Sequence, residues 1–227
     1  ICSDGLVSLG NLVRQGRGKK TETISYKIQA ALNADIQSYG TQFGWQGVLH
    51  PLGNKIIINV PVVQDSTSYQ YVQNTINQSW CTYGKLGSPW NAACFCVLGD
   101  VLYWGGSTIV AKADTGVSDN GNVISGSMLP AFSYFKTDRQ KLFTLVRPLF
   151  TTTGIGTPTF LAQLCVDFSI NAPTGSVPFG TASYGVWDTS KWGVGLWGTG
   201  LTVRKAWQTV GALGFSGSLF IKIASKT

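Results

Sequence analysis

Residues able to do acid–base or nucleophilic chemistry are few in this chain of 227 residues. His50 is the single histidine and stands outside any Gly-x-Ser-x-Gly sequence, so a serine triad lacks its base and the context of its nucleophile. Two carboxylates would suffice for a glycosidase, and the candidate pool is Asp100, Asp114, Asp119, Asp167 and Asp188. Asp100 and Asp119 stand in turn-like contexts, where aspartate is favoured for hydrogen bonding to the backbone. We therefore expect no enzyme activity and no catalytic residue.

The cysteines are odd in number, and we expect them to be reduced: Cys2, Cys81, Cys94, Cys96 and Cys165. Cys94 and Cys96 lie two positions apart, so on a strand they share a face without favouring a bridge to each other. A zinc site would require a Cys-x2-Cys knuckle and a second pair of ligands. The sequence also has no Gly-x4-Gly-Lys phosphate loop and no calcium-binding aspartate ladder. It predicts no metal site and no cofactor.

Basic residues exceed acidic ones by 17 to 10, which gives a formal net charge of +7. The excess concentrates in one Gly-containing stretch with four basic residues: Arg14, Arg17, Lys19 and Lys20. Such a cluster could contact the phosphates of DNA or an acidic partner. A solvated basic loop explains the same residues, because an isolated cluster is a weak indication of binding.

The surface is expected to be short of charge, because charged residues are only 12% of the chain, against about a quarter in typical soluble domains. With a mean hydropathy of +0.12, some apolar area must be exposed, and such area is often covered by partner subunits. No apolar run reaches the roughly 20 residues of a membrane-spanning helix. The sequence from Ile1 lacks the layout of a signal peptide and an initiator methionine. We expect a trimmed or partial chain that is neither a membrane protein nor a secretory precursor.

One segment, residues 24–39, has the periodicity of an amphipathic helix. Its apolar residues recur at a spacing of three to four, from Ile24 through Leu32 to Ile36. Gly40 follows directly and is expected to end the helix. This should be the one long helix of the chain.

After Phe43 the sequence is typical of short β-strands separated by Gly, Asn, Asp and Ser. Strands are expected at 55–62, 68–75, 79–84, 93–98, 101–105, 108–114, 143–150 and 159–168. Gly99-Asp100 suits a two-residue hairpin turn with positive φ at glycine. Asn77-Gln78 is a second, weaker turn signal.

The predicted fold is all-β, with β-propeller-like blades, a second β unit and one N-terminal helix. The strands after residue 50 group into sets in which an apolar strand leads to a strand bearing Trp or Tyr, although the repeat is imperfect. The expected division is an N-terminal segment at 1–50, the blades at 51–130, and a C-terminal β unit with a Trp-rich tail at 131–227.

Aromatic residues suggest two kinds of binding surface. Trp187, Trp192 and Trp197 are spaced by five, which fits neither a helix face nor one face of a continuous strand. They are expected either to anchor the core or to insert into a neighbouring subunit. A carbohydrate-binding lectin is the alternative function, in which sugar rings would stack on Tyr69, Tyr71, Trp80, Tyr103 and Trp104. Cross-strand pairs in the core would explain those five residues equally.

Several phrases, taken in order, resemble the tail hub proteins of short-tailed bacteriophages, also called packaged-DNA stabilisation proteins. The resemblance covers roughly the whole chain and corresponds to about the C-terminal half of a typical member. The phrases are TQFGWQGVLHPLGNKIIINVPV (41–62), YQYVQNTINQSWCTYG (69–84), WNAACF (90–95), DVLYWGG (100–106), AKADTGVSDNG (111–121) and AFSYF with QKLFTLVRP (131–148).

The resemblance implies a structural virion protein without catalytic activity. Its copies would form a ring on the tail axis below the portal and adaptor, extending the DNA channel and helping to retain packaged DNA. Implied partners are other copies of the chain, the portal or adaptor, a tail needle or tailspike protein, and packaged DNA. Assembly in the host cytoplasm would suit the unpaired cysteines, and the implied final location is the virion tail.

Overall fold

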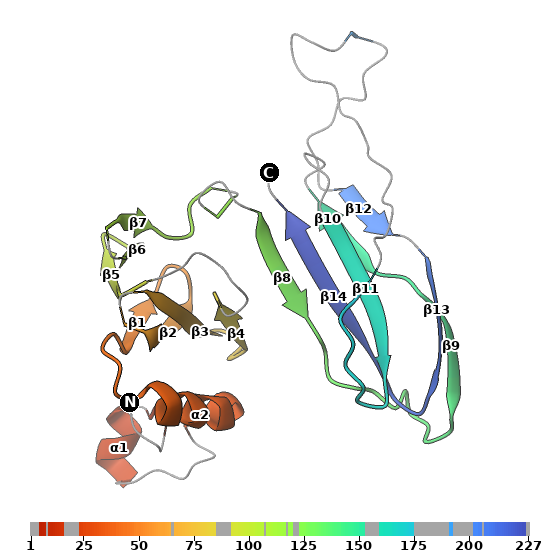
Figure 1. Cartoon of the computed structure of the whole chain (residues 1–227), viewed down its shortest axis with the longest axis horizontal. Helices are drawn as coiled ribbons and strands as arrows, with labels where there is room; N and C mark the ends of the chain where they lie inside the picture. The colour runs from red at the N-terminus through yellow and green to blue at the C-terminus, as the bar shows by residue number, and fades with distance from the viewer. Residues whose placement is uncertain are drawn as a thin grey trace. The chain divides into compact units, whose positions relative to one another are not determined.

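The structure, a computed structural model, has an all-β fold whose described helices lie near the N-terminus (Figure 1). It describes residues 5–7, 9–15, 23–64, 66–84, 92–106, 108–116, 118–119, 123–152, 159–174, 191–192, 202–205 and 207–225. The chain divides into two compact units, which we call unit 1 (Ile1–Thr115) and unit 2 (Gly116–Thr227).

Unit 1 begins with three helical segments, α1 (Leu9–Gln15), the 3₁₀ turn η2 (Tyr26–Ile28) and α2 (Gln29–Tyr39). The last two confirm the helix predicted at 24–39, apart from its first residues. Gly40 follows α2 with a right-handed backbone (φ −61°), so the helix ends without the left-handed conformation usual for a C-terminal glycine. The short helix α1 has no counterpart among the sequence predictions.

A four-stranded antiparallel sheet forms the centre of unit 1, in the order β1-β2-β3-β4. Its strands are β1 (Gln46–His50), β2 (Lys55–Val63), β3 (Thr67–Asn74) and β4 (Trp80–Tyr83). Strands paired in chain order make a meander, the arrangement found in propeller blades. The predicted turn at Asn77-Gln78 lies in the connection from β3 to β4, where Gln78 has a φ of 56° and its N–H donates to the carbonyl of Asn74.

A second antiparallel sheet of unit 1 contains β5 (Cys94–Leu98), β6 (Val101–Gly105) and β7 (Val110–Lys112). Gly99 and Asp100 form the turn between β5 and β6 with φ of 56° and 61°, which confirms the predicted two-residue hairpin. Gln46 of β1 joins this sheet to the first one. Its side-chain amide donates to the carbonyl of Phe95 (2.8 Å) and accepts from the N–H of Phe95 (2.6 Å).

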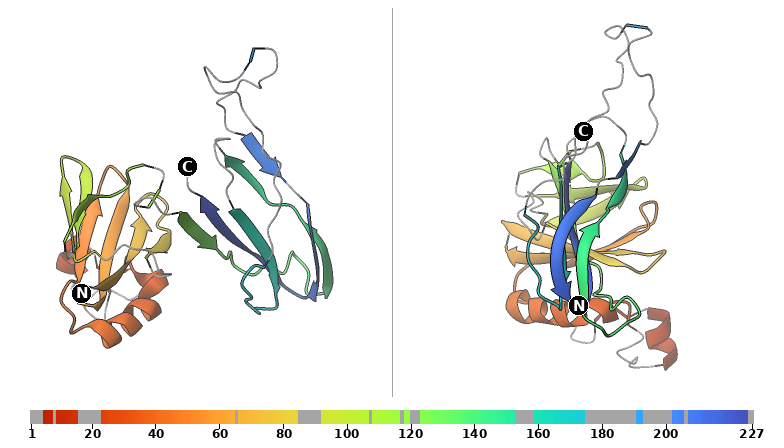
Figure 2. Two further views of the ribbon diagram at one scale, coloured as in Figure 1. Left: turned by 45° about the horizontal axis from the view of Figure 1, so that its top comes forward. Right: turned by 90° about the vertical axis from the view of Figure 1, so that its right-hand side faces the viewer.

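Both faces of the β2–β3 hairpin are covered, which explains the nearly continuous apolar run in β2. Figure 2 shows α2 lying across one face, where the buried cluster consists of Leu32, Ile58, Val60, Tyr69 and Tyr71. The cluster on the other face brings in side chains of the second sheet, and it consists of Ile57, Val72, Ala92, Phe95, Leu102 and Ala113. Neighbouring residues of β2 therefore belong to different cores, because successive side chains of a strand point to opposite faces.

Unit 2 contains three antiparallel sheets among its described strands, β11-β14-β8, β13-β9 and β10-β12. The strands are β8 (Ile124–Met128), β9 (Lys141–Val146), β10 (Leu149–Thr152), β11 (Thr159–Val166), β12 (Thr202–Lys205), β13 (Gln208–Gly214) and β14 (Gly217–Ser225). Because β8 pairs with β14, the division of the chain falls before β8 and not at the predicted boundary after residue 130. Likewise β1, in the predicted N-terminal segment 1–50, belongs to the central sheet of unit 1.

The strand predicted at 143–150 is in fact two strands, β9 and β10, with Arg147 and Pro148 between them. Proline has no backbone N–H to donate to a ladder, so a break at Pro148 follows from its chemistry. The strand predicted at 159–168 ends at Val166, because Asp167 and Phe168 both have positive φ (47° and 63°) and turn the chain.

Candidate functional site

The residues predicted from sequence to contact DNA or a neighbouring subunit are described only in part. Arg14 lies exposed on α1, and Arg17, Lys19 and Lys20 lie outside the described residues. Trp192 is 72% exposed, and Trp187 and Trp197 also lie outside the described residues. The described members of both sets are therefore accessible to a partner.

The aromatic residues of the lectin interpretation lie largely in the core of unit 1. Tyr69 and Tyr71 are 6% and 3% exposed and meet edge to face, with ring centroids 5.6 Å apart. Trp80 packs against the same cluster, and Trp104 packs against the cluster on the opposite face of the sheet. Tyr103 is half-buried. Since stacking on a sugar requires an open ring face, Tyr69 and Tyr71 are not available for it.

Tyr71 and Asp35 connect β3 to α2 through a hydrogen bond from the phenol to the carboxylate. Burial, together with this bond, raises the pKa of Tyr71 to about 12. Burial likewise raises the pKa of Tyr69, to which Asp35 and Tyr71 also contribute. Both phenols therefore stay neutral at physiological pH, and the phenol of Tyr71 serves as a hydrogen-bond donor within the core.

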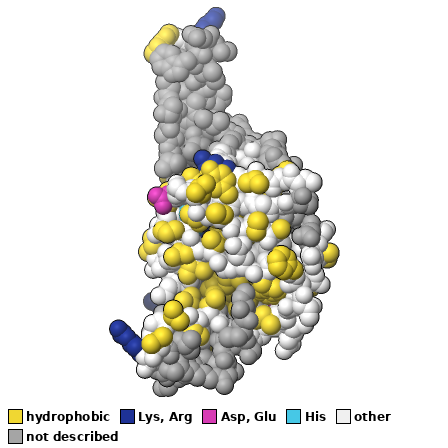
Figure 3. Space-filling model, turned by 90° about the vertical axis from the view of Figure 1, so that its left-hand side faces the viewer, with side chains coloured by type: hydrophobic (Ala, Val, Ile, Leu, Met, Phe, Trp, Pro, Cys, Tyr) yellow, Lys and Arg dark blue, Asp and Glu magenta, His cyan; other side chains and the backbone are white. Residues whose placement is uncertain are grey.

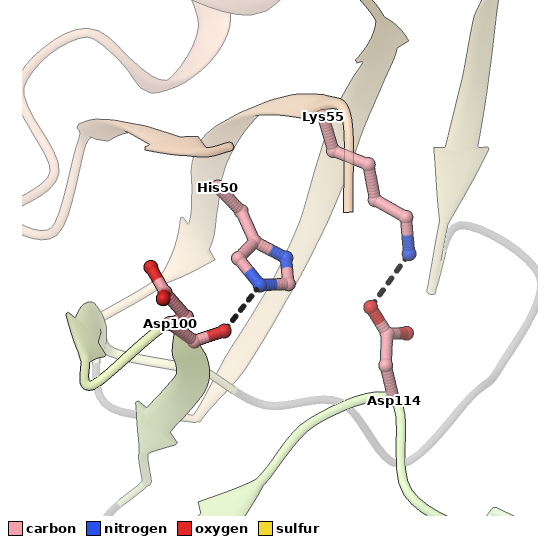
Figure 4. A network of polar contacts seen from close by, with 4 residues as sticks. All are labelled: His50, Lys55, Asp100 and Asp114. Atoms are coloured by element: carbon pink, nitrogen blue, oxygen red, sulfur yellow. Dashed lines mark hydrogen bonds and ion pairs between the residues drawn. The ribbon is translucent and has the colours of Figure 1, made fainter. Parts of the chain in front are cut away.

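His50, the only histidine, is buried at the end of β1 and bonds to the hairpin turn of the second sheet (Figure 4). Its Nε2–H donates to the carbonyl oxygen of Asp100 at 3.0 Å. Nδ1 is buried and has no hydrogen-bond partner among the described residues, and a side chain at Gly53 would lie 2.6 Å from it. This close packing leaves no room for a substrate beside Nδ1.

Lys55 and Asp114 form the second polar contact in Figure 4, with Nζ and Oδ2 2.6 Å apart. Burial lowers the pKa of Lys55, but the hydrogen bond and charge of Asp114, with Tyr83, outweigh it and leave the pKa raised. Burial raises the pKa of Tyr83 and of Cys81, against the opposing charge of Lys55. Lys55 is thus held as a cation and Cys81 as a thiol, which is the less reactive form of cysteine.

Asp167 is the carboxylate with the clearest structural role in unit 2. Its Oδ1 accepts hydrogen bonds from the backbone N–H groups of Ser216 (2.9 Å) and Phe215 (2.8 Å). These bonds, with a hydroxyl bond from Ser216 and the charge of Lys141, hold the pKa of Asp167 below its ordinary value. The carboxylate thus ties the turn after β11 to the connection between β13 and β14.

Protonating Asp167 is expected to weaken unit 2. Because the pKa is lower in the folded chain than in the unfolded chain, this group stabilises the fold above its unfolded pKa. The contribution should be lost as the pH falls below about 4 and through the folded pKa. Urea unfolding of the wild type and of Asp167→Asn at pH 6 and at pH 3 measures this effect. An equal drop in unfolding free energy in both proteins would contradict the assignment.

A pocket of unit 1 beside β2 is too small for a ligand. It has a volume of about 10 Å³, which is room for one water molecule. Its lining includes Phe43, Asn59, Ser68 and Ala92. The amide of Asn59 donates from the buried side to the carbonyls of Gly44 (2.9 Å) and Ala92 (3.0 Å). These polar groups satisfy one another and have a structural role.

Apolar surface is the most extensive feature that could serve a partner. In unit 2 the buried apolar residues among the described ones are Phe160, Cys165, Pro148 and Pro173. Fifteen large apolar residues of the same unit are exposed, and they include Ile124, Met128, Leu142, Trp207 and Leu213. Unit 1 also exposes apolar groups, and Figure 3 shows them spread over one face with few charged side chains among them.

Sequence reasoning singled out the Trp-rich tail and missed the strands of unit 2 as an apolar surface. The signal is present in β14, where Leu219, Ile221 and Ile223 alternate with Phe220 and Lys222. Register pairs Ile221 with Met128 of β8 and with Ala162 of β11, so these side chains share one face. We call this face, with Phe160, Leu164, Leu219, Ile223 and Ile124, the apolar face. Phe160 is covered there by stacking on Phe150 of β10 at 5.0 Å, whereas Ile124 and Met128 are about half exposed.

Comparison with protein families, with curated protein sequences and with solved structures finds no match to the chain. Among the described residues, no group of three or more His, Cys, Asp or Glu side chains is placed to hold a metal ion. None of the described helices is long and apolar enough to cross a membrane.

Proposed function

We propose that this chain is a structural virion protein, a subunit of the tail hub ring of a short-tailed bacteriophage. In this role it extends the DNA channel below the portal and adaptor and helps to retain the packaged genome. The proposed partners are copies of itself, the portal or adaptor, a tail needle or tailspike protein, and packaged DNA. Its location is the virion tail, after assembly in the host cytoplasm, and no catalytic step is assigned to it.

The observation that carries the proposal is the apolar surface of unit 2. Among the described residues of unit 2, fifteen large apolar residues are exposed to solvent. Exposed apolar surface is often covered at subunit interfaces, because large apolar patches are uncommon on monomeric proteins. A ring of identical subunits offers such cover to every copy. The resemblance of the ordered sequence phrases to tail hub proteins is the reason for proposing this particular ring.

The lectin alternative receives no comparable support. Two of its five aromatic residues, Tyr69 and Tyr71, are buried, and the pocket beside β2 has room for one water molecule. A phosphate-binding role for the basic stretch is compatible with the exposed position of Arg14.

Electron microscopy of the purified chain, with analytical ultracentrifugation, tests the proposal. We expect closed rings with cyclic symmetry and a mass that is a multiple of 24.3 kDa. Oligomers with stable interfaces of standard size stay assembled at protein concentrations well below about 100 µM. A chain that forms no species larger than a dimer up to this concentration would overturn the ring, and glycan-array binding by such a chain would favour the lectin.

Trp192→Ala separates an interface role of the tail from a core role. Because Trp192 is 72% exposed, its removal should leave the melting temperature of the single chain nearly unchanged. Ring assembly should weaken by about 2 kcal/mol per subunit contact, as for an interface anchor. The matched control is Phe43→Ala, which removes an exposed aromatic residue of unit 1, outside the surface on which the proposal rests. Normal assembly with a large fall in melting temperature would show that Trp192 belongs to the core.

A further inference from the structure

The open edge of the sheet β11-β14-β8 is the strand β8. It pairs with β14 on one side and with no described strand on the other, and all five of its residues are exposed. The opposite edge strand, β11, is accompanied by its own chain: Gln163 accepts from the N–H of Thr174 at 3.3 Å, and Cys165 contacts the carbonyl of Asn171. Figure 1 shows β8 at the end of this sheet.

β8 lacks the features that protect edge strands from pairing. Such strands usually carry lysine, proline, a bulge or an inward-pointing charge, because their free N–H and C=O groups otherwise recruit another strand. The sequence of β8 is Ile-Ser-Gly-Ser-Met, with neither charge nor proline, and its register with β14 runs without interruption from Ile124 to Met128. The backbone N–H and C=O groups along this edge can therefore pair with a fourth strand.

The sequence of β8 also indicates which strand it accepts, because it is symmetric about Gly126. Ser125 and Ser127 flank the glycine, and Ile124 and Met128 flank the serines. An antiparallel contact between two identical strands requires that each residue meets its mirror position on the other copy. A register centred on Gly126 meets this condition with apolar against apolar and serine against serine.

We infer that β8 pairs antiparallel with β8 of a second copy of this chain, with Gly126 opposite Gly126 of the second copy. Ile124 then lies opposite Met128 of the second copy and extends the apolar face from one sheet into the next. Ser125 lies opposite Ser127 of the second copy on the other face, where hydroxyl pairs are favourable. The two three-stranded sheets become one six-stranded sheet across a two-fold axis.

Charge and space are compatible with this contact. Lys222 is opposite Ser127 in the register of β14 with β8, on the face of the serines. In the two-fold register Ser127 lies opposite Ser125 of the second copy. In that copy Ser125 pairs with Ala224, so Lys222 of one copy does not lie opposite Lys222 of the other. A Cβ atom added at Gly126 would meet nothing within 4 Å.

This inference is independent of the proposed ring. A two-fold contact closes after two copies, whereas a ring needs a head-to-tail contact that repeats around an axis. A dimer without rings would overturn the proposed function and leave the β8 contact standing. Rings that form without the β8 contact would support the proposed function and overturn this inference.

Disulfide trapping tests the register directly. In a background of Cys2→Ser, Cys81→Ser, Cys94→Ser and Cys96→Ser, which leaves only the buried Cys165 of the five native cysteines, Gly126→Cys should form a covalent dimer under mild oxidation. Opposed Cα atoms of an antiparallel pair lie about 4.5–5.5 Å apart, within the span of a disulfide. Ser125→Cys alone should cross-link at least about tenfold more slowly, because its partner position is residue 127.

Mixing Ser125→Cys with a Ser127→Cys chain should restore rapid cross-linking, and only between the two kinds of chain. Peptide mass spectrometry identifies the linked residues. A Gly126→Cys dimer that forms no faster than the Ser125→Cys dimer would overturn the register.

A second variant covers the case in which cysteine perturbs the strand. Gly126→Lys, for which the structure has space, places two like charges opposite each other and should convert the dimer to a monomer in ultracentrifugation. Hydrogen exchange in β11 and β14 checks that the sheet remains folded. A folded Gly126→Lys chain that dimerises as tightly as the wild type would refute the β8 contact.

Discussion

Phe160→Ala is expected to destabilise unit 2 by about 3–5 kcal/mol, the usual cost of removing a fully buried phenylalanine. Phe160 is 2% exposed and stacks on Phe150 with ring centroids 5.0 Å apart. Because the other buried apolar residues in the described part of unit 2 are the small side chains of Cys165, Pro148 and Pro173, little else can compensate. Whole domains are stable by only about 5–15 kcal/mol, so most of the stability of unit 2 should be lost.

Hydrogen exchange on the full chain measures this effect strand by strand. Protection should fall in β11, β14 and β8 and persist in β2 and β3, whose buried clusters belong to unit 1. The matched control is Leu142→Ala, which removes a side chain that is 66% exposed and should cost less than about 0.5 kcal/mol. Equal losses in the two variants, or a loss that spreads evenly through unit 1, would show that Phe160 does not support a separate core.

Asn59→Asp is expected to cost unit 1 more than about 3 kcal/mol at neutral pH. Asn59 is fully buried, donates from Nδ2 to the carbonyls of Gly44 and Ala92, and accepts at Oδ1 from the amide of Gln70 (3.0 Å). Aspartate has nearly the same shape but no donor, so its carboxylate would face two carbonyl oxygens without compensation. Chemical denaturation, followed by tryptophan fluorescence, measures the loss.

The loss of stability caused by Asn59→Asp should grow as the pH rises, whereas the stabilisation by Asp167 is lost as the pH falls. Burial disfavours the charged carboxylate, so the folded pKa lies above the unfolded one and stability is lost as the pH rises through it. The variant should therefore approach the wild type as the pH falls. Asn77→Asp makes the same change in an exposed turn, where the side chain only accepts hydrogen bonds, and should change stability by less than about 0.5 kcal/mol. If Asn59→Asp changed the unfolding free energy as little as Asn77→Asp does, the role of Asn59 as a buried hydrogen-bond donor would be contradicted.

Local signals were sufficient for the elements whose conformation depends on neighbouring residues. The Gly99-Asp100 turn follows from the ability of these residues to adopt positive φ. The helix at 26–39 follows from apolar spacing, with Leu32 at the centre of its buried face. Propensity did not reveal β8, because Ile-Ser-Gly-Ser-Met is a weak strand former and extends only by pairing with β14.

The sequence by itself determined the all-β character, the scarcity of charge and the excess of apolar residues that must be exposed, since these depend on composition and short-range pattern. Tertiary structure alone decided which residues meet across the chain. It buried Tyr69 and Tyr71 under α2, where sequence allowed them a place on the surface. It also paired β8 with β14 of the same unit, so that the division of the chain falls before β8 and this uncharged strand lies at an open edge. The physical reason is that pairing between strands far apart in sequence is chosen by the packing of whole faces, which no local segment encodes.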